Sequence, residues 1–302
     1  MEIPRVPDQV ARVWSESAEG RGLLADLPAV VTGLCERFGL ARIGAPWPGG
    51  WVGYVVPAVR GDGTAAVLKL SLTDEEHRLE ADALARWAGD GAVRLLDRVR
   101  EPNAMLLERC APGTPLLDHP DRDAAITIAC GILRRLELPL APGHPFLPVT
   151  ELARRYTTWI PAGFARLGRA FDARLADEAA SLCAAFAADT SPPHVVNRDF
   201  HLGNVLAAER EPWLAIDPKP LAGERAFDTG HLLRDVLPDP LEPAAVGRLV
   251  ARLADELELD SGRVRGWALV RSVENALWCL QDGDPPDWDV AVAAELARLG
   301  SS

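Results

Sequence analysis

The stretch that decides the fold is Asn197-Arg198-Asp199-Phe200-His201-Leu202-Gly203-Asn204-Val205-Leu206, followed after a polar turn by Trp213-Leu214-Ala215-Ile216-Asp217-Pro218-Lys219. Asp199 and Asn204 have the spacing D-x-x-x-x-N on a loop that leads into a β-prone run over 204–207. Asp217 follows a second β-prone run, 213–216, and a hairpin of the two runs would return it beside Asn204. Three oxygen-bearing side chains are therefore expected to converge from one short segment.

This set of side chains suits phosphoryl transfer to an alcohol. That reaction needs a carboxylate to accept the hydroxyl proton, here Asp199, and oxygen ligands for magnesium, here Asn204 and Asp217. An Asp five residues before an Asn is, by itself, more often an Asx-turn or a helix cap. The agreement of the spacing, the flanking strands and the trailing Asp217 favours a catalytic loop.

Lysine is rare in the chain, so the position of each lysine is informative. Only Lys69 and Lys219 are lysine among the 32 basic residues, a skew typical of a coding bias toward arginine. Lys69 ends a predicted strand over 65–70, where a compact ammonium would suit nucleotide phosphates. A lysine so placed needs a carboxylate, and we expect Glu80, in a predicted helix over 74–88, with Glu76 as the rival one turn earlier.

The remaining pattern predicts an α+β chain of two lobes, 1–109 and 110–302, with a break at Pro112-Gly113. The first lobe reads as a small antiparallel sheet with a hairpin turn at Asp62-Gly63 and a helix between its third and fourth strands. An opening helix is expected to start at Asp26 and stop at Gly39. The second lobe reads as mainly helical, with helices over 123–138, 150–167 and 171–188 and from 227 to the end.

Bulk composition excludes several classes of protein. The net charge of −12 argues against a nucleic-acid partner and is compatible with a cationic small-molecule substrate. No run approaches the roughly 20 apolar residues of a membrane span, and the N-terminus lacks a signal core, so the cytoplasm is the expected compartment. The oligomeric state is open, with a monomer as the default. The cysteines have no zinc spacing and are expected to be reduced: Cys35, Cys110, Cys130, Cys183 and Cys279.

Several segments resemble the aminoglycoside and hydroxyurea antibiotic-resistance kinases, and most closely the streptomycin 6-phosphotransferases among them. The similar segments are Ala66-Val67-Leu68-Lys69-Leu70, Glu80-Ala81-Asp82-Ala83-Leu84, Gly91 to Asp97, Met105 to Arg109, Val205 to Lys219, Gly223 to Asp228 and Glu274 to Trp278. The resemblance covers roughly residues 20–300, and the central block is specific.

The resemblance implies a protein-kinase-like fold, with a small antiparallel-sheet N-lobe, a larger helical C-lobe, and ATP or GTP with Mg²⁺ in the cleft between them. It implies that the backbone near Glu108 and Cys110 contacts adenine. The implied roles agree with those above: Asp199 the base, Asn204 and Asp217 the metal ligands, and Lys69 with Glu80 the phosphate clamp.

Two departures from the family pattern stand out. Asn197 occupies the position where many kinases of this superfamily have a structural His, and it is expected to keep a loop hydrogen bond. Glu224-Arg225 stands where relatives commonly show Asp-Pro, so altered loop geometry is expected there without loss of catalysis.

Five further side chains are candidates for roles in the site. His201 orients the loop or touches substrate, or is a second base; Lys219 approaches the phosphate or the acceptor, or pairs with Asp228. Asp228 is a candidate to anchor the catalytic loop through hydrogen bonds with the backbone of the loop. Glu274 and Trp278 are the predicted acceptor-facing edge, although the commoner fate of such rings is a buried core.

The first functional hypothesis is O-phosphorylation of a streptomycin-like antibiotic, which would confer resistance. Hydroxyurea or an endogenous sugar or amino alcohol is the alternative acceptor. A nucleotide-binding pseudokinase is a remote alternative because the lysine, base and metal ligands are all present. A protein kinase is disfavoured, since no H-R-D loop or D-F-G to A-P-E segment occurs.

Overall fold

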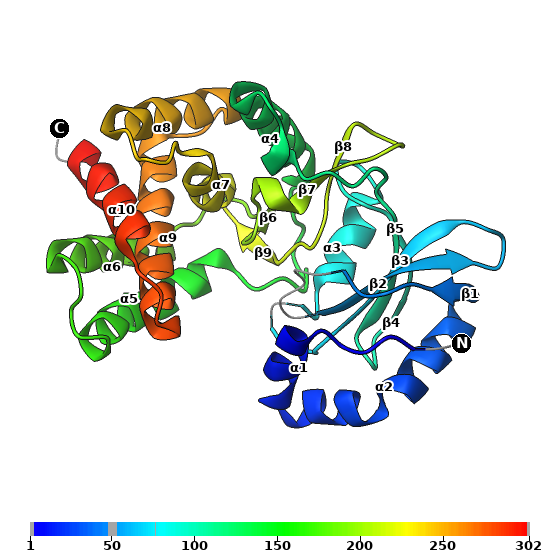
Figure 1. Cartoon of the computed structure of the whole chain (residues 1–302). Helices are drawn as coiled ribbons and strands as arrows, with labels where there is room; N and C mark the ends of the chain where they lie inside the picture. The colour runs from blue at the N-terminus through cyan, green and yellow to red at the C-terminus, as the bar shows by residue number, and fades with distance from the viewer. Residues whose placement is uncertain (1–2, 48–52, 76, 301–302) are drawn as a thin grey trace. The chain divides into compact units, whose positions relative to one another are not determined.

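The computed structural model describes residues 3–47, 53–75 and 77–300, and the chain divides into two compact units (Figure 1). Unit one holds residues 1–114 together with 206–216, and unit two holds 115–205 and 217–302. The sequence analysis placed one boundary, between residues 109 and 110. In the structure the segment 206–216 also belongs to unit one. No helix among the described residues is long and apolar enough to cross a membrane.

Unit one is built on an antiparallel sheet, as predicted, and the sheet has five strands. Its strands follow the order β1-β2-β3-β5-β4 and span Leu40–Ile43 (β1), Gly53–Arg60 (β2), Ala65–Ser71 (β3), Leu95–Val99 (β4) and Ala104–Glu108 (β5). The β2–β3 turn is the predicted one: Asp62 Oδ1 accepts from Thr64 N at 2.9 Å and Gly63 has φ +87°. Helix α3 (Glu80–Trp87) connects β3 to β4, which confirms the expected insertion, although it begins at Glu80 and not at Asp74. The glycine pair Gly49-Gly50, before β2 in the sequence, lies outside the described residues.

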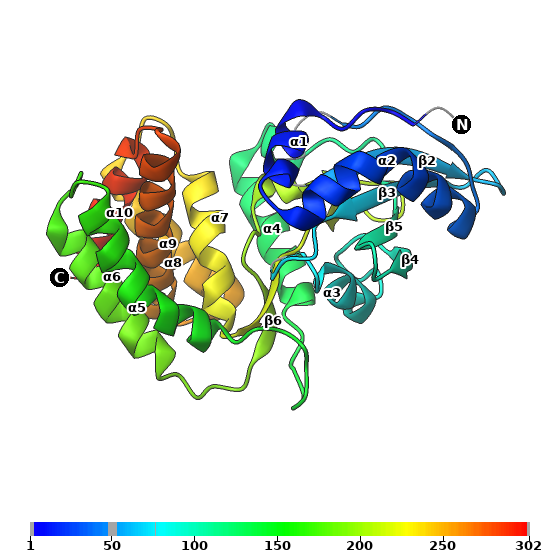
Figure 2. The ribbon, with the colours of Figure 1, turned by 90° about the horizontal axis from the view of Figure 1, so that it is seen from below.

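Two helices, α1 (Asp8–Ser15) and α2 (Ala18–Arg37), cover one face of this sheet (Figure 2). The prediction that the opening helix starts at Asp26 is wrong: Ser17 Oγ accepts from Gly20 N at 2.9 Å and caps α2 nine residues earlier. Buried residues continue on both sides of Pro28, which lies inside the helix, so packing overrides the proline signal. The predicted stop at Gly39, with φ +63°, is confirmed.

Strand β3 alternates between the two faces of the sheet. Its even-numbered residues, Ala66, Leu68 and Leu70, belong to the core under α1 and α2. Because successive side chains in a strand point to opposite faces, Lys69 lies on the face away from those helices.

Unit two is mainly helical. Its helices are α4 (Arg122–Leu136), α5 (Val149–Arg166), α6 (Ala173–Ala187), α7 (Thr229–Val236), α8 (Pro243–Leu257), α9 (Ser261–Asp282) and α10 (Asp287–Gly300). The first three agree with the predicted helices to within two residues. Helix α9 is the centre of the bundle, because it packs against α5, α6, α7, α8 and α10 (Figure 2). Its middle part is buried on nearly all sides, including the charged residues Arg271 and Glu274.

Two short strand pairs frame the segment quoted at the start. β6 (His194–Asn197) pairs antiparallel with β9 (Pro220–Gly223), with Asn197 opposite Pro220. β7 (Val205–Ala207) pairs with β8 (Trp213–Ala215), as the predicted hairpin requires. Residues 198–204 therefore leave β6 and enter β7, while 217–219 leave β8 and enter β9.

Two glycines of α2 should respond in opposite ways to alanine. A Cβ at Gly20 would lie 2.1 Å from the Trp14 carbonyl oxygen, whereas a Cβ at Gly33 meets nothing within 4 Å. We expect Gly20→Ala to lower the free energy of unfolding by about 1–3 kcal/mol through overpacking. Gly33→Ala should raise it by up to about 1 kcal/mol, because alanine favours helix. Urea unfolding followed by circular dichroism measures both; equal effects of the two substitutions would contradict this packing.

Candidate active site

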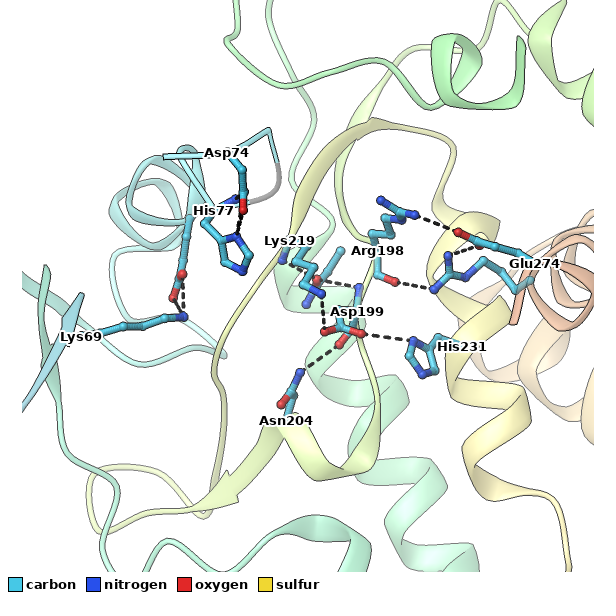
Figure 3. A network of polar contacts seen from close by, with 12 residues as sticks. Lys69, Asp74, His77, Arg198, Asp199, Asn204, Lys219, His231 and Glu274 are labelled. Atoms are coloured by element: carbon cyan, nitrogen blue, oxygen red, sulfur yellow. Dashed lines mark hydrogen bonds and ion pairs between the residues drawn. The ribbon is translucent and has the colours of Figure 1, made fainter. Parts of the chain in front are cut away.

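The predicted lysine–carboxylate pair is present in unit one. Lys69 Nζ lies 2.8 and 2.7 Å from the two carboxylate oxygens of Glu80, the first residue of α3 (Figure 3). The two side chains are 8% and 0% exposed. The pair forms with Glu80, the residue preferred from sequence; the rival Glu76 lies outside the described residues. Removing one partner of such a buried ion pair lowers stability by about 3–5 kcal/mol, because the other charge is left buried without a counter-charge. Glu80 therefore holds the Lys69 ammonium in one place.

The start of α3 is held by a cap on the preceding turn. Asp74 Oδ1 accepts from the backbone N–H of His77 at 2.8 Å and lies 2.7 Å from His77 Nδ1 (Figure 3). The His77 carbonyl in turn accepts from Glu80 N at 3.3 Å. These contacts place Glu80 opposite Lys69 at the point where the helix begins.

Two residues were predicted to contact adenine through their backbone: Glu108, which ends β5, and Cys110, which follows the strand. The Glu108 carboxylate accepts from Arg210 Nε at 2.7 Å and from Arg94 N at 2.9 Å. Burial opposes ionisation of Glu108, but the Arg210 hydrogen bonds outweigh it and lower the pKa of the carboxyl. Burial, then the Glu108 charge, raises the pKa of Cys110 to about 11, so its thiol stays protonated. Arg210, which sequence reasoning missed, thus ties the segment 206–216 to β5.

In unit two, Asn197 at the end of β6 organises the loop that carries Asp199. Its Oδ1 accepts from the backbone N–H groups of Asp199 at 3.1 Å and of Lys219 at 2.9 Å. Its own N–H donates to Asp228 Oδ1 at 2.7 Å. The hydrogen bond expected of Asn197, and the anchoring role expected of Asp228, are both confirmed.

The rest of the loop is closed by local hydrogen bonds. Leu202 N donates to Asp235 Oδ2 at 2.8 Å, and Gly203 N donates to His201 Nδ1 at 3.1 Å. Asn204 Nδ2 donates to the Asp199 carbonyl at 3.2 Å. His201 therefore has the loop-orienting contact that was one of its predicted roles.

Asp199 lies among basic side chains. Lys219 Nζ is 3.3 Å from its Oδ2, and His231 Nδ1 is 3.4 Å from its Oδ1 (Figure 3). Burial opposes ionisation of Asp199, but the Lys219 ammonium outweighs it and lowers the pKa below the ordinary value. Burial, with Arg271 adding to it, lowers the pKa of His231 to about 3, so this imidazole is neutral at pH 7. Asp199 is thus an anion that can accept a proton. Its ion pair with Lys219 is a contact that the sequence did not predict, because the carboxylate considered for Lys219 was Asp228.

The two predicted metal ligands suit magnesium by their chemistry. The Asn204 amide nitrogen is used by the Asp199 carbonyl, which leaves the amide oxygen as the ligand atom. Asp217 follows β8 with φ +51° and adds a carboxylate. Within the described ranges, no three His, Cys, Asp or Glu side chains form a metal-binding group. An amide and one carboxylate, completed by phosphate oxygens and water, form a donor set typical of Mg²⁺.

The two residues of the predicted acceptor-facing edge, Glu274 and Trp278, differ in exposure. Glu274 is 1% exposed, and its carboxylate accepts from Arg198 Nη2 at 2.8 Å and from Tyr156 Oη. Trp278, one turn later on α9, is 41% exposed, and its ring centroid lies 5.5 Å from that of Trp159. The expectation that Glu274 faces an acceptor does not fit its burial, since its oxygens are turned to the catalytic loop. Trp278 keeps an exposed face.

Several residues of this site were missed by sequence reasoning: Tyr156, Arg210, His231, Asp235 and Arg271. Only Arg271 had a visible signal, because it forms an i,i+3 pair with Glu274 within an apolar run of α9. A single His or Asp on a short helix such as α7 has no pattern that distinguishes it from a surface residue.

Comparison with known proteins adds relatives over almost the whole chain. The family model described as aminoglycoside/hydroxyurea antibiotic resistance kinase matches residues 46–283. The chain is 39% identical to streptomycin 6-kinase of Streptomyces griseus, over 97% of each chain. It is 40% identical to hydroxyurea phosphotransferase of Kitasatospora aureofaciens, over 97% of this chain and 86% of that one.

Solved structures agree in fold. The aminoglycoside phosphotransferase APH(4)-Ia, in a ternary complex with AMP-PNP and hygromycin B, matches with a TM-score of 0.60 at 17% identity, over 91% of this chain and 99% of that one. The protein-kinase-like fold predicted from the sequence is thereby confirmed.

Removing the Lys219 charge should raise the pKa of Asp199. In Lys219→Met the largest effect that opposes burial is lost, so we expect the pKa to rise by about 1–3 pH units, whereas Lys219→Arg keeps the pKa low. The stability that the ionised Asp199 contributes is present above its unfolded value of about 3.9 and is lost as the pH falls through the folded pKa. Carbon-13 NMR titration of labelled aspartates, with Asp199→Asn to assign the resonance, measures the shift. An unchanged titration in Lys219→Met would disprove the pairing.

Proposed function

The chain belongs to the aminoglycoside/hydroxyurea antibiotic resistance kinase family, and from this premise we propose that it transfers the γ-phosphoryl group of ATP to a hydroxyl of a streptomycin-like aminocyclitol. The observation that carries the proposal is the environment of Asp199. This carboxylate is anionic, its backbone N–H is fixed by Asn197, and its side chain lies beside Lys219. A base in this state is what transfer to an alcohol requires.

The proposed mechanism assigns proton acceptance to Asp199. Its carboxylate accepts the proton of the acceptor hydroxyl while that oxygen bonds to phosphorus and the bond from phosphorus to the leaving nucleoside diphosphate breaks. A low pKa serves this step, because the carboxylate is then ionised before the acceptor binds. Lys219 contributes by keeping the charge on Asp199 and by holding Oδ2, at 3.3 Å from its ammonium.

The remaining roles concern the nucleotide. Lys69, fixed by Glu80, would pair with phosphate oxygens through its ammonium. Asn204 and Asp217 would hold Mg²⁺, which when bound neutralises charge on the phosphate oxygens. Catalysis then consists chiefly of placement and charge compensation, since phosphoryl transfer needs little covalent help from the protein.

The acceptor class is inferred from charge and from the relatives. A net charge of −12 favours a cationic acceptor over a neutral one, and streptomycin is the substrate named for the first relative. Hydroxyurea is the second candidate, because the relative named for it is as similar to this chain, at 40% identity. An added phosphate would give a cationic drug negative charge and bulk, which would weaken its fit to a target and so confer resistance.

An acceptor panel tests the reaction. We expect ATP consumption with Mg²⁺ to rise well above background with streptomycin, less with other aminoglycosides, and the product mass to increase by one phosphate group. Turnover with hydroxyurea instead would favour the second candidate. If no member of the panel, including sugars and amino alcohols, stimulates ATP consumption, the proposed acceptor class is wrong.

Substitutions of the two aspartates should separate proton transfer from nucleotide binding. Asp199→Asn is expected to lower kcat about 10²–10⁴-fold, because the base is lost, with little change in nucleotide Kd. Asp217→Asn should weaken nucleotide binding in the presence of Mg²⁺ and leave metal-free binding unaltered. Calorimetric titration with a non-hydrolysable ATP analogue, with and without Mg²⁺, measures binding. Turnover retained in Asp199→Asn would remove this residue from the role of base.

A further inference from the structure

Arg198, the residue before the proposed base, forms hydrogen bonds through its backbone N–H, its carbonyl and its side chain. Its backbone N–H donates to the Lys219 carbonyl at 3.0 Å, and its carbonyl accepts from Arg271 Nη2 at 3.2 Å. Its Nη2 donates to Glu274 Oε1 at 2.8 Å (Figure 3). The same nitrogen donates to Tyr156 Oη at 3.0 Å. A residue so bound has little freedom in its backbone or its side chain.

The peptide bond between Arg198 and Asp199 is consequently fixed on both sides. Its oxygen accepts from Arg271, and its N–H, which belongs to Asp199, donates to Asn197 Oδ1 at 3.1 Å. The plane of this peptide sets the direction of the Cα–Cβ bond of Asp199, because a trans peptide leaves only φ and ψ to vary. Holding the plane therefore helps to aim the carboxylate.

The groups that hold this peptide from α9 are themselves buried and charged. Glu274 and Arg271 are 1% and 6% exposed and lie one helical turn apart, with Arg271 Nη1 donating to Glu274 Oε2. Burial opposes ionisation of Glu274, but Arg271 and then Arg198 outweigh it and lower its pKa to about 2, so the cluster keeps its charges.

Such a cluster is poorly explained by stability alone. Well-packed apolar side chains of similar volume often stabilise a protein as much as a buried ion pair or more. Most buried neighbours of this cluster along α9 are apolar, including Trp267, Val270 and Val273. The charges converge on one place, the backbone and side chain of the residue that precedes Asp199.

We propose that Glu274 and Arg271 are positioning residues, which clamp the Arg198–Asp199 peptide and so hold the carboxylate of the base in its reactive direction. The proposal rests on the proposed role of Asp199. Neither side chain reaches a reacting atom; both act through Arg198. A displacement of the base by about 1 Å is enough to lower turnover about 10²-fold, so a loosened clamp should reduce kcat and leave ligand binding unaltered.

Glu224, which precedes the short turn 225–228, offers a matched control because its carboxylate binds residues of the same helix. Its carboxylate also accepts three N–H donors, Arg263 Nε at 2.7 Å, Arg263 Nη2, and Trp267 Nε1 at 2.6 Å, and its side chain is 13% exposed. Arg263 and Trp267 belong to α9, as Arg271 and Glu274 do. The donors of the Glu224 carboxylate include no residue of the catalytic loop.

The test compares Glu274→Ala, Glu274→Gln, Arg271→Gln and Glu224→Ala in the full chain. We expect kcat to fall about 100-fold in Glu274→Ala and about 10-fold in Glu274→Gln, which keeps an acceptor for Arg198, with KM for ATP and acceptor changed less than about threefold. Arg271→Gln should lower kcat in the same way. Glu224→Ala should lower the unfolding midpoint by a similar amount and keep kcat within about twofold.

Amide hydrogen exchange tests the clamp without any acceptor. In the protein alone, peptides covering 198–204 should exchange faster in Glu274→Ala than in the parent protein, and at the parental rate in Glu224→Ala. If the parent protein phosphorylates no acceptor, the proposed function fails while this comparison still decides the clamp.

Three outcomes would overturn the proposal. Equal losses of kcat in Glu274→Ala and Glu224→Ala would reduce Glu274 to a stabilising residue. A raised KM for the acceptor with kcat intact would make it an acceptor contact, as expected from the sequence. Unchanged exchange over 198–204 in Glu274→Ala would show that the loop is held by other groups.

Discussion

The amide oxygen of Asn197 joins the two segments on which the candidate site depends. It accepts from the N–H of Asp199, just beyond β6, and from the N–H of Lys219, just before β9. The pairing of β6 with β9 brings these two N–H groups to the same side, and Asn197 is 2% exposed, so water does not compete for its oxygen. The ion pair between Lys219 and Asp199 follows from this arrangement, because both side chains start from fixed backbone positions.

The electrostatics of the chain concentrate on a few buried or half-buried charges. Both lysines of the sequence pair with a carboxylate of the candidate site, Lys69 with Glu80 and Lys219 with Asp199. A compact ammonium binds a carboxylate or phosphate as a point charge from any direction, whereas the planar fork of arginine must be aligned with its partner. This difference explains why lysine persists at these two positions in a chain that uses arginine elsewhere.

Arginine has a different task in unit two, where it holds backbone. Arg271 donates to a carbonyl of the catalytic loop, and Arg225, in the Glu224-Arg225 pair that departs from the family pattern, donates to the Leu257 carbonyl at 2.9 Å and to Glu137. Several N–H groups on one guanidinium allow a single side chain to satisfy a carboxylate and a carbonyl together. The bundle around α9 thereby connects the loop of Asp199 to the core of the unit, so that rigidity reaches the base through packing and hydrogen bonds.

The sequence by itself determined the features that depend on local chemistry. The helices over 122–136, 149–166 and 173–187, the Asp62-Gly63 turn, the β7–β8 hairpin and the pairing of Lys69 with Glu80 could all be predicted, because each is set by periodicity, turn residues or short separation along the chain. The start of α2 could not, since burial on both sides of Pro28 outweighed a local signal.

Only the tertiary structure decided which distant side chains surround Asp199 and which way each one points. His231 and Asp235 come to the loop on α7, and Glu274 turns inward to Arg198 while Trp278, one turn later, stays exposed. These relations depend on how helices far apart in the sequence rotate and pack against one another, and a rotation of one residue about a helix axis exchanges a buried carboxylate for an exposed one. No periodicity within a single segment records that rotation, because it is set by the fit between helices.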